Sequence, residues 1–236
     1  MKKILELTPD AEALFVRRDN RFLATVDIVQ PFKEADVFAH IHDPGRLKEI
    51  LIEGNRLLLK RAQNPQRKTK WDVIAGKVNH NWVLIHSGYH RKIAEAILRQ
   101  PEISPFKERY EIKPEPKYKR ARLDFLLKKG EEAIWVETKG CTLAVDGVAL
   151  FPDAPTKRGK RHVEHLIEIR STGERAAVIF LVFRSDAEVF SPNWETDREF
   201  AQTLKVAQEE GVELYALKLS YDAKAISFVE PIPVNL

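Results

Sequence analysis

A change of sequence pattern near Gly88 constrains the fold of this chain more than any other feature. Before it, short runs rich in Val, Ile, Leu or Phe are bounded by Asn, Gly, Pro or charged residues, a pattern typical of short β-strands. The predicted strands are 13–18, 21–29, 35–41, 56–61, 72–78 and 82–86. Five or six short strands in so few residues predict a small all-β barrel of OB-like size.

After Gly88 the pattern predicts alternating helices and strands. Residues 91–99 place four apolar side chains on one helical face, and Pro101 ends that helix. Strands are then predicted at 108–113, 121–128 and 133–139, followed by a helix at about 156–171, a buried strand at 176–183, a helix from Thr196 with a capping-box pattern to Glu199, and a strand at 212–218. The order predicts an α/β domain with a mixed sheet, so we divide the chain into residues 1–88 and 89–236.

Composition sets only loose limits on partners and cellular setting. The 236 residues carry a formal net charge of +4, which favours an acidic partner weakly. The single cysteine, Cys141, excludes an internal disulfide, fits a reducing cytoplasm and is expected to be a small buried thiol. No apolar stretch reaches the roughly 20 residues that span a bilayer, so we expect a cytoplasmic protein with no membrane partner.

The segment from Arg122 to Lys139 carries the strongest chemical signal. Two apolar strands flank a polar turn, and Gly130 suits the first position of a two-residue type II′ loop. Such a loop places Asp124 directly opposite Glu137, and directly opposed residues share one face of a sheet. By the same register Arg122 faces Lys139. The sequence therefore predicts two carboxylates and two cations together on one face of the hairpin.

Two opposed carboxylates repel one another unless a counter-charge lies between them. A divalent cation, Mg²⁺ or Mn²⁺, bound by Asp124 and Glu137 would supply it and could activate water or polarise a phosphodiester. Lys139 would then orient the water or stabilise charge that develops on phosphate, and Arg122 would hold a phosphate or tune Asp124. The alternative is a salt-bridged surface at the end of a hairpin, which would also bring acidic and basic side chains together. The Glu-x-Lys triplet alone is weak evidence, because it arises by chance and this chain has two others, beginning at 111 and 115.

Clusters of basic residues predict contacts with phosphate groups. Such residues in a barrel loop, followed by an aromatic side chain, suit a nucleic-acid backbone. The candidate phosphate-binding residues are Lys60, Arg61, Arg67, Lys68 and Lys70 in the first domain, and Lys119, Arg120, Arg122, Arg158, Lys160, Arg161 and His162 in the second. A solvated charged surface is the alternative for any one cluster, and for Trp71, which follows the barrel loop, we expect a core position.

Several segments resemble the sugar fermentation stimulation protein (SfsA) family. They are Arg122-Leu123-Asp124-Phe125, Val136-Glu137-Thr138-Lys139, Thr142-Leu143, Phe151-Pro152-Asp153-Ala154-Pro155-Thr156, Arg158-Gly159 and His162, together with Arg21-Phe22-Leu23-Ala24, the segment His40 to Leu47, and Glu95-Ala96-Ile97-Leu98. The resemblance runs over nearly the whole chain. It implies DNA binding, an OB-like barrel, and a second domain similar to PD-(D/E)xK nucleases, with a restriction-endonuclease-like αβββαβ core.

The resemblance also implies roles for single residues. Asp124, Glu137 and Lys139 would form the nuclease-type motif, and Glu95, or alternatively Glu111, would supply a further carboxylate to the metal. The chain departs from the family pattern at some positions. It has Thr138 and Gly140 where Val and Ser are frequent, Asp43-Pro44-Gly45 where many members have Asn-Thr-Gly, and His165 where an acid is frequent. We expect none of these departures to touch the proposed metal ligands.

Three functional interpretations stay open at this point. The first is a protein that binds DNA through phosphate contacts with little sequence specificity and cleaves phosphodiesters at a Mg²⁺ or Mn²⁺ site. The second is a catalytically inactive DNA-binding regulator that keeps the nuclease fold, and the family name implies that it would regulate sugar-metabolism genes. The third is an enzyme acting on a small phosphorylated molecule, which would use the same carboxylates and need no basic barrel loop. A homodimer is also left open.

Overall fold

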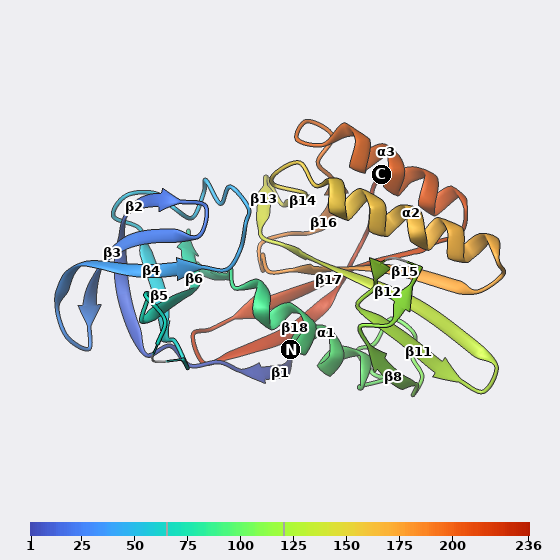
Figure 1. Ribbon diagram of the computed structural model, residues 1–236, viewed down its shortest axis with the longest axis horizontal. Coiled ribbons are helices and arrows are strands. Elements are labelled where there is room, and N and C mark those ends of the chain that lie inside the picture. Colours follow the sequence, from blue (N-terminus) through green and yellow to red (C-terminus); the bar gives the residue numbers. More distant parts are fainter. Residues whose placement is uncertain (65, 120) are drawn as a thin grey trace.

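Five strands of the N-terminal half close into a small barrel, at the left of Figure 1. The structure, a computed structural model, describes residues 1–64, 66–119 and 121–236. The barrel strands are β2 (Ala11–Asn20), β3 (Leu23–Gln30), β4 (Glu34–Ile41), β5 (Arg56–Arg61) and β6 (Trp71–Val78). They pair in the order β4-β3-β2-β5-β6, and a parallel pairing of β4 with β6 closes the ring. The predicted all-β barrel is thereby confirmed.

Alternation of side chains along the strands fills the barrel. Val26 and Ile28 of β3 and Leu57 and Leu59 of β5 are each at most 2% exposed, because every second residue of a strand points inward. Trp71 is 4% exposed, which confirms its expected place in the core.

The C-terminal half is built on a mixed sheet flanked by helices, as predicted. After β7 (Asn81–Leu84) a short 3-10 turn, η1 (Ser87–Tyr89), leads into helix α1 (His90–Leu98). The sheet contains β8 (Glu111–Pro114), β11 (Phe125–Lys129), β12 (Glu132–Cys141), β15 (Arg175–Val182), β17 (Glu213–Tyr221), β18 (Ala225–Ile232) and β1 (Lys2–Glu6). Strands β12, β15 and β17 are parallel, and β8, β11, β18 and β1 pair antiparallel to their neighbours. The elements α1, β8, β11, β12, α2 and β15 give the predicted αβββαβ order.

Helices cover both faces of this sheet. Figure 1 shows α2 (Lys157–Ser171) and α3 (Arg198–Glu209) stacked over one face, and α1 lying on the other. Along β15, Ile179 and Leu181 pack with α1, whereas Val178 and Phe180 pack with α2 and α3. A strand buried on both faces reads as a continuous apolar run, which explains the pattern at 176–183.

The first strand of the chain lies outside the barrel. Strand β1, within the predicted unit 1–88, pairs with β18, the last strand. The barrel sheet and the α/β sheet are also continuous, because Trp82 of β7 lies opposite Tyr221 of β17. Two connections therefore fix the barrel against the α/β part.

Several local details differ from the sequence-based expectation. The strand predicted at 121–128 is divided into β10 (Ala121–Arg122), which pairs with β9 (Lys117–Tyr118), and β11. A small sheet of β13 (Leu143–Val145), β14 (Val148–Phe151) and β16 (Val189–Pro192) was not predicted. The N-cap of α3 is Asp197, not Thr196, because the Asp197 carboxylate accepts the Phe200 amide at 3.0 Å. Within the described residues no helix is both long and apolar enough to cross a membrane.

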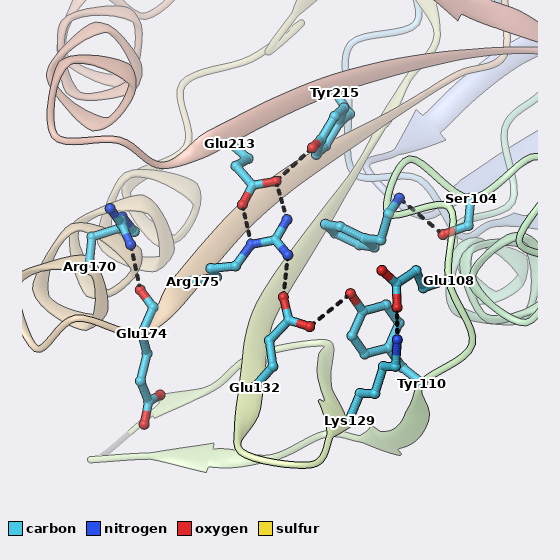
Figure 2. Close-up of polar contacts among 11 residues, drawn as sticks. Ser104, Glu108, Tyr110, Lys129, Glu132, Arg170, Glu174, Arg175, Glu213 and Tyr215 are labelled. Atoms are coloured by element: carbon cyan, nitrogen blue, oxygen red, sulfur yellow. Dashed lines mark hydrogen bonds and ion pairs between the residues drawn. The ribbon is translucent and has the colours of Figure 1, made fainter.

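An ion-pair network ties together the first residues of the three parallel strands (Figure 2). Arg175 at the start of β15 donates to both oxygens of Glu213 at 2.7 and 2.9 Å, and it also pairs with Glu132 at the start of β12. The Tyr215 hydroxyl donates to Glu213 at 2.6 Å. Glu213 and Glu132 raise the pKa of Arg175, so the guanidinium stays charged. This network holds the strands in register at their N-terminal ends.

The network predicts a loss of stability when its cation is removed. We expect Arg175→Met to lower the free energy of unfolding by about 1 kcal/mol, because Glu132 and Glu213 lose a shared, partly solvent-screened cation. Urea unfolding measures this change, with the exposed Arg109→Met as the matched control. A variant as stable as wild type would show that the network contributes nothing to stability.

Candidate functional site

The hairpin of β11 and β12 has the register predicted from its turn. Phe125 lies opposite Val136 and Leu127 opposite Ile134. Gly130 adopts a φ of 61°, a conformation that glycine reaches without steric cost. The ladder ends at Phe125, one residue before the predicted carboxylate pair.

The chain leaves the ladder at Asp124, which overturns one predicted pairing. The backbone carbonyl of Asp124 accepts the Glu115 amide at 2.9 Å, so this part of the chain runs beside residues 115–118. Arg122 is exposed and lies opposite Lys117 of β9. The predicted placement of Arg122 opposite Lys139 is therefore wrong.

The Asp124 carboxylate points back at β12 and is held there by Thr138. The backbone amide and the hydroxyl of Thr138 donate to Oδ2 at 2.7 and 2.6 Å. Thr138 thus touches a proposed ligand, contrary to our expectation. The reason is that Asp124 lies one residue beyond the end of the β11–β12 ladder, and its side chain reaches across to β12. No hydrogen bond from a described residue reaches Oδ1. Burial, and then the charge of Glu137, raise the pKa of Asp124.

Glu137 is a buried carboxylate that is satisfied on one side only. Alternation along β12 points it toward α2, and it is 2% exposed. Its Oε1 contacts the Lys139 ammonium and Nδ1 of His162. Its Oε2 is buried and has no hydrogen-bond partner among the described residues. Burial alone would raise the pKa of Glu137, but the charges of Lys139 and His162 outweigh it and leave the pKa below its ordinary value.

The N-terminus of α2 lies at the same place. The Thr156 hydroxyl caps it by accepting the Gly159 amide at 3.0 Å. A helix N-terminus presents backbone N–H groups and a positive dipole end, which favour anions. Arg158, in the first turn, lies with its Nε 3.5 Å from Nε2 of His162. An anion entering here would meet the helix end and a guanidinium together.

One cavity of about 390 Å³ collects these groups. Asp124, Glu137, Lys139, Arg158 and His162 all line it. The structure thus brings together the three residues of the predicted motif and two of the predicted phosphate-binding residues. A neighbouring cavity of about 260 Å³ also contains Lys139 in its wall and extends to barrel and loop residues that our sequence reasoning had not assigned to a site, among them Arg21, Asp43 and Asp153.

The predicted further carboxylate does not lie in the cavity. Glu95 faces Arg99, whose Nε donates to it at 3.1 Å, and Glu111 is exposed on β8 opposite Lys128. Helix α1 instead contributes His90 and Arg91 to the cavity wall.

Sequence reasoning missed His90, which approaches the motif closely. Burial lowers its pKa to about 4, so the imidazole is neutral at pH 7. A Cβ placed on Gly140 would lie 2.1 Å from Cε1 of His90. Gly140 therefore permits this approach, and a serine there would displace the imidazole. In the sequence, only the departure from the family pattern at Gly140, beside Lys139, could have indicated that another side chain approaches this point.

The predicted phosphate-binding residues of the barrel loop differ in availability. Arg67 donates to both oxygens of Asp72 at 3.1 and 2.7 Å, and Lys60 pairs with Asp10 at 3.1 Å. The guanidinium of Arg61 lies 4.7 Å from the centre of the Trp71 ring. Lys68 and Lys70 are exposed, and neither forms an ion pair with a described residue. These two are the freest to meet a phosphate.

The remaining predicted phosphate-binding residues of the second domain also differ in their contacts. Lys119 pairs with Glu168 at 2.7 Å, and Lys160 pairs with Glu199 at 3.0 Å, so both are partly neutralised. Arg161, like Arg122, is exposed. Arg120 lies outside the described residues.

The site predicts opposite effects of one substitution on stability and on cation binding. We expect Asp124→Asn to raise the free energy of unfolding without metal at pH 7 by about 1 kcal/mol, because a repelled, buried charge is removed. The gain should vanish as the pH falls below the ordinary pKa of aspartate, where wild type is protonated in both states.

Calorimetry with Mg²⁺ and Mn²⁺ completes this test. Asp124→Asn should abolish cation binding, and Glu131→Gln, in the exposed turn of the same hairpin, should not. The opposite outcome is expected if Lys139 and His162 already neutralise the carboxylates of Asp124 and Glu137. Wild type would then show no heat of cation binding, and Asp124→Asn would be less stable than wild type.

Comparison with known proteins identifies the family. The family model described as "Sugar fermentation stimulation protein RE domain" matches residues 88–225, and the "SfsA N-terminal OB domain" matches residues 16–85, which confirms the OB-like character of the barrel.

Relatives match over nearly the full length. A sugar fermentation stimulation protein homolog of Methanococcoides burtonii is 43% identical over 98% of this chain and 94% of its own. One of Methanosphaera stadtmanae is 46% identical over 91% and 89%. The solved structure of Pyrococcus furiosus SfsA in complex with Ca²⁺ covers both chains completely, at 30% identity and a TM-score of 0.89. The chain belongs to the sugar fermentation stimulation protein (SfsA) family.

Proposed function

We propose that this protein binds DNA through its phosphates and cleaves phosphodiesters at a divalent-cation site formed by Asp124 and Glu137. One observation carries the proposal: Oε2 of Glu137 is buried with no hydrogen-bond partner in the described part of the chain, and Glu137 lines the same cavity as Asp124 and the N-terminus of α2. Burying a carboxylate oxygen without a partner raises the free energy of the folded protein, and a bound cation would remove this penalty.

The donor set fits a hard cation. Asp124 offers Oδ1 and Glu137 offers Oε2, and Mg²⁺ takes one or two carboxylates together with waters and phosphate oxygens. The related Pyrococcus furiosus protein is described in complex with Ca²⁺, another oxygen-preferring cation. When bound, such an ion activates water and neutralises charge on a phosphodiester.

Side chains of this protein supply the remaining functions. Arg158 and the backbone amides that begin α2 would hold the phosphate, because both present donors to the cavity. Lys139, held by Glu137, would stabilise negative charge that develops on the phosphate or orient the attacking water. His162 contacts the same oxygen of Glu137 as Lys139 does, so it would help to hold this carboxylate in place and leave Oε2 for the cation.

The barrel would bind the DNA backbone. Residues 86–92 span the connection from β7 and the first turn of α1. Three of them line the motif cavity, and four others line a basic barrel cavity that contains Lys60 and Arg61. A nucleic-acid backbone held by the barrel loop would therefore lie close to the motif. Phosphate contacts carry no base identity, which is why we propose little sequence specificity.

A regulator without turnover is the second candidate. One observation favours it: Lys139 and His162 already neutralise one oxygen of Glu137. In that case the protein would keep the fold and DNA binding, and the family name would reflect regulation of sugar-metabolism genes. The two candidates differ only in cleavage.

DNA binding should be dominated by phosphate contacts. We expect the double variant Lys68→Ser/Lys70→Ser to weaken binding equally for unrelated sequences, and to lower the slope of log affinity against log salt by about 2 on duplex DNA. Lys205→Ser/Lys224→Ser, the same charge change at exposed positions elsewhere, is the control. Binding of inorganic phosphate but of no DNA would support the small-molecule enzyme instead.

Cleavage should depend on Lys139 separately from the cation. We expect Lys139→Ala to keep Mn²⁺ binding within about threefold of wild type but to lower DNA cleavage at least about a hundredfold, because both carboxylates remain while the ammonium that acts on the phosphate or the water is lost. Gel assays with single-stranded, duplex and branched DNA, with and without Mg²⁺ or Mn²⁺, measure this, and the exposed Lys128→Ala is the control. Wild type that binds cation and DNA but cleaves none of these substrates would favour the regulator.

A further inference from the structure

A second cluster of metal-ligand side chains lies in the barrel, separate from Asp124 and Glu137. His42 follows β4, Asp72 belongs to β6, and His86 follows β7. One ligand atom from each lies within 4.8 Å of the other two. Nε2 of His42 is 3.2 Å from Oδ1 of Asp72.

Both imidazoles have a nitrogen available. Nδ1 of His86 is buried and forms no hydrogen bond with any described residue. Nε2 of His42 is also buried, and its polar neighbour is the carboxylate of Asp72, which it meets without hydrogen-bond geometry. The two rings stack with their centres 3.7 Å apart, so they cannot both carry a charge without strong repulsion. Neutral imidazole is the form that binds metal.

We propose that His42, Asp72 and His86 form a binding site for a divalent transition metal ion of the Zn²⁺ class. Two imidazole nitrogens and one carboxylate oxygen suit Zn²⁺ or Co²⁺, and they do not suit Mg²⁺ or Ca²⁺. Ligand atoms around tetrahedral zinc lie about 3.3 Å apart, so the three side chains would close in around the ion. The stacked imidazoles would also turn, because the nitrogen lone pair that binds the ion lies in the plane of its ring. The site does not rest on the function proposed for Asp124 and Glu137.

The ion pair between Arg67 and Asp72 is the strongest argument against a metal site here, and substitution of Arg67 is also its most discriminating test. It donates to both oxygens of Asp72, so the cluster could be a closed ion pair that needs no metal. A carboxylate has about four lone-pair positions, so Asp72 can accept Arg67 and still bind an ion. Arg67 then orients the ligand but repels the ion. Its removal should strengthen a metal site and should weaken an ion-pair cluster.

The surroundings indicate what a bound ion would do. The three side chains line a cavity of about 350 Å³ together with Lys60 and Arg61. Three protein ligands leave a fourth position for water or an anion, and the basic wall favours an anion such as phosphate. The ligands also come from the end of β4, from β6 and from the segment leading to α1, so the ion would hold the barrel to its connection and stabilise the folded protein.

The experiment uses the full-length, tag-free protein carrying Asp124→Asn, stripped of metal with a chelator. This background removes the other proposed cation site, so failure of either proposal can be recognised separately. Zn²⁺ and Co²⁺ are titrated by calorimetry, and the visible spectrum of Co²⁺ reports nitrogen ligation. We expect one equivalent to bind, with affinity at least about tenfold above that for Mg²⁺.

Single variants then assign the ligands. His42→Gln and His86→Gln should each weaken Zn²⁺ binding at least about tenfold, whereas His80→Gln, an exposed histidine on the β6–β7 turn, should leave it unchanged. Arg67→Gln should tighten it. Metal-free melting curves confirm that each variant folds. The proposal is overturned if no stoichiometric Zn²⁺ binds, if both histidine variants bind as before, or if Arg67→Gln only loses stability without gaining affinity.

Discussion

Burial of β12 on both faces is the constraint on which the site depends. Val136 packs under α1, so its neighbour Glu137 has to point toward α2, where its side chain is almost fully buried. A carboxylate there requires counter-charges, and Lys139 on the same face and His162 on α2 provide them for one oxygen. The other oxygen has no partner among the described residues, and this asymmetry supports the proposed cation site.

Local patterns were enough to predict the architecture and much of the motif. The barrel, the αβββαβ order and the hairpin register all follow from apolar runs and from Gly130, which act within a few residues of one another. The position of Asp124 did not follow, because it depends on residues 115–118, which draw the chain away from β12 and place Arg122 elsewhere. Thr138 likewise became a partner of Asp124 only through this change in direction.

Contacts between distant segments were beyond sequence reasoning. His42 and Asp72 meet because β4 and β6 pair in parallel to close the barrel, and His86 reaches them from the strand that leaves it. His90 reaches Gly140 because α1 begins immediately after that segment. The same short connection thus lies beside both proposed metal sites, one with oxygen donors and one with nitrogen donors.

The most direct test of the central claim is a crystal of the protein soaked in Mn²⁺ and measured at a wavelength where manganese scatters anomalously. The account predicts an anomalous peak within bonding distance of Oδ1 of Asp124 and Oε2 of Glu137, and its absence in the Asp124→Asn protein. A manganese peak only at the His42 cluster, or none in a well-ordered motif cavity, would contradict a cation site at Asp124 and Glu137.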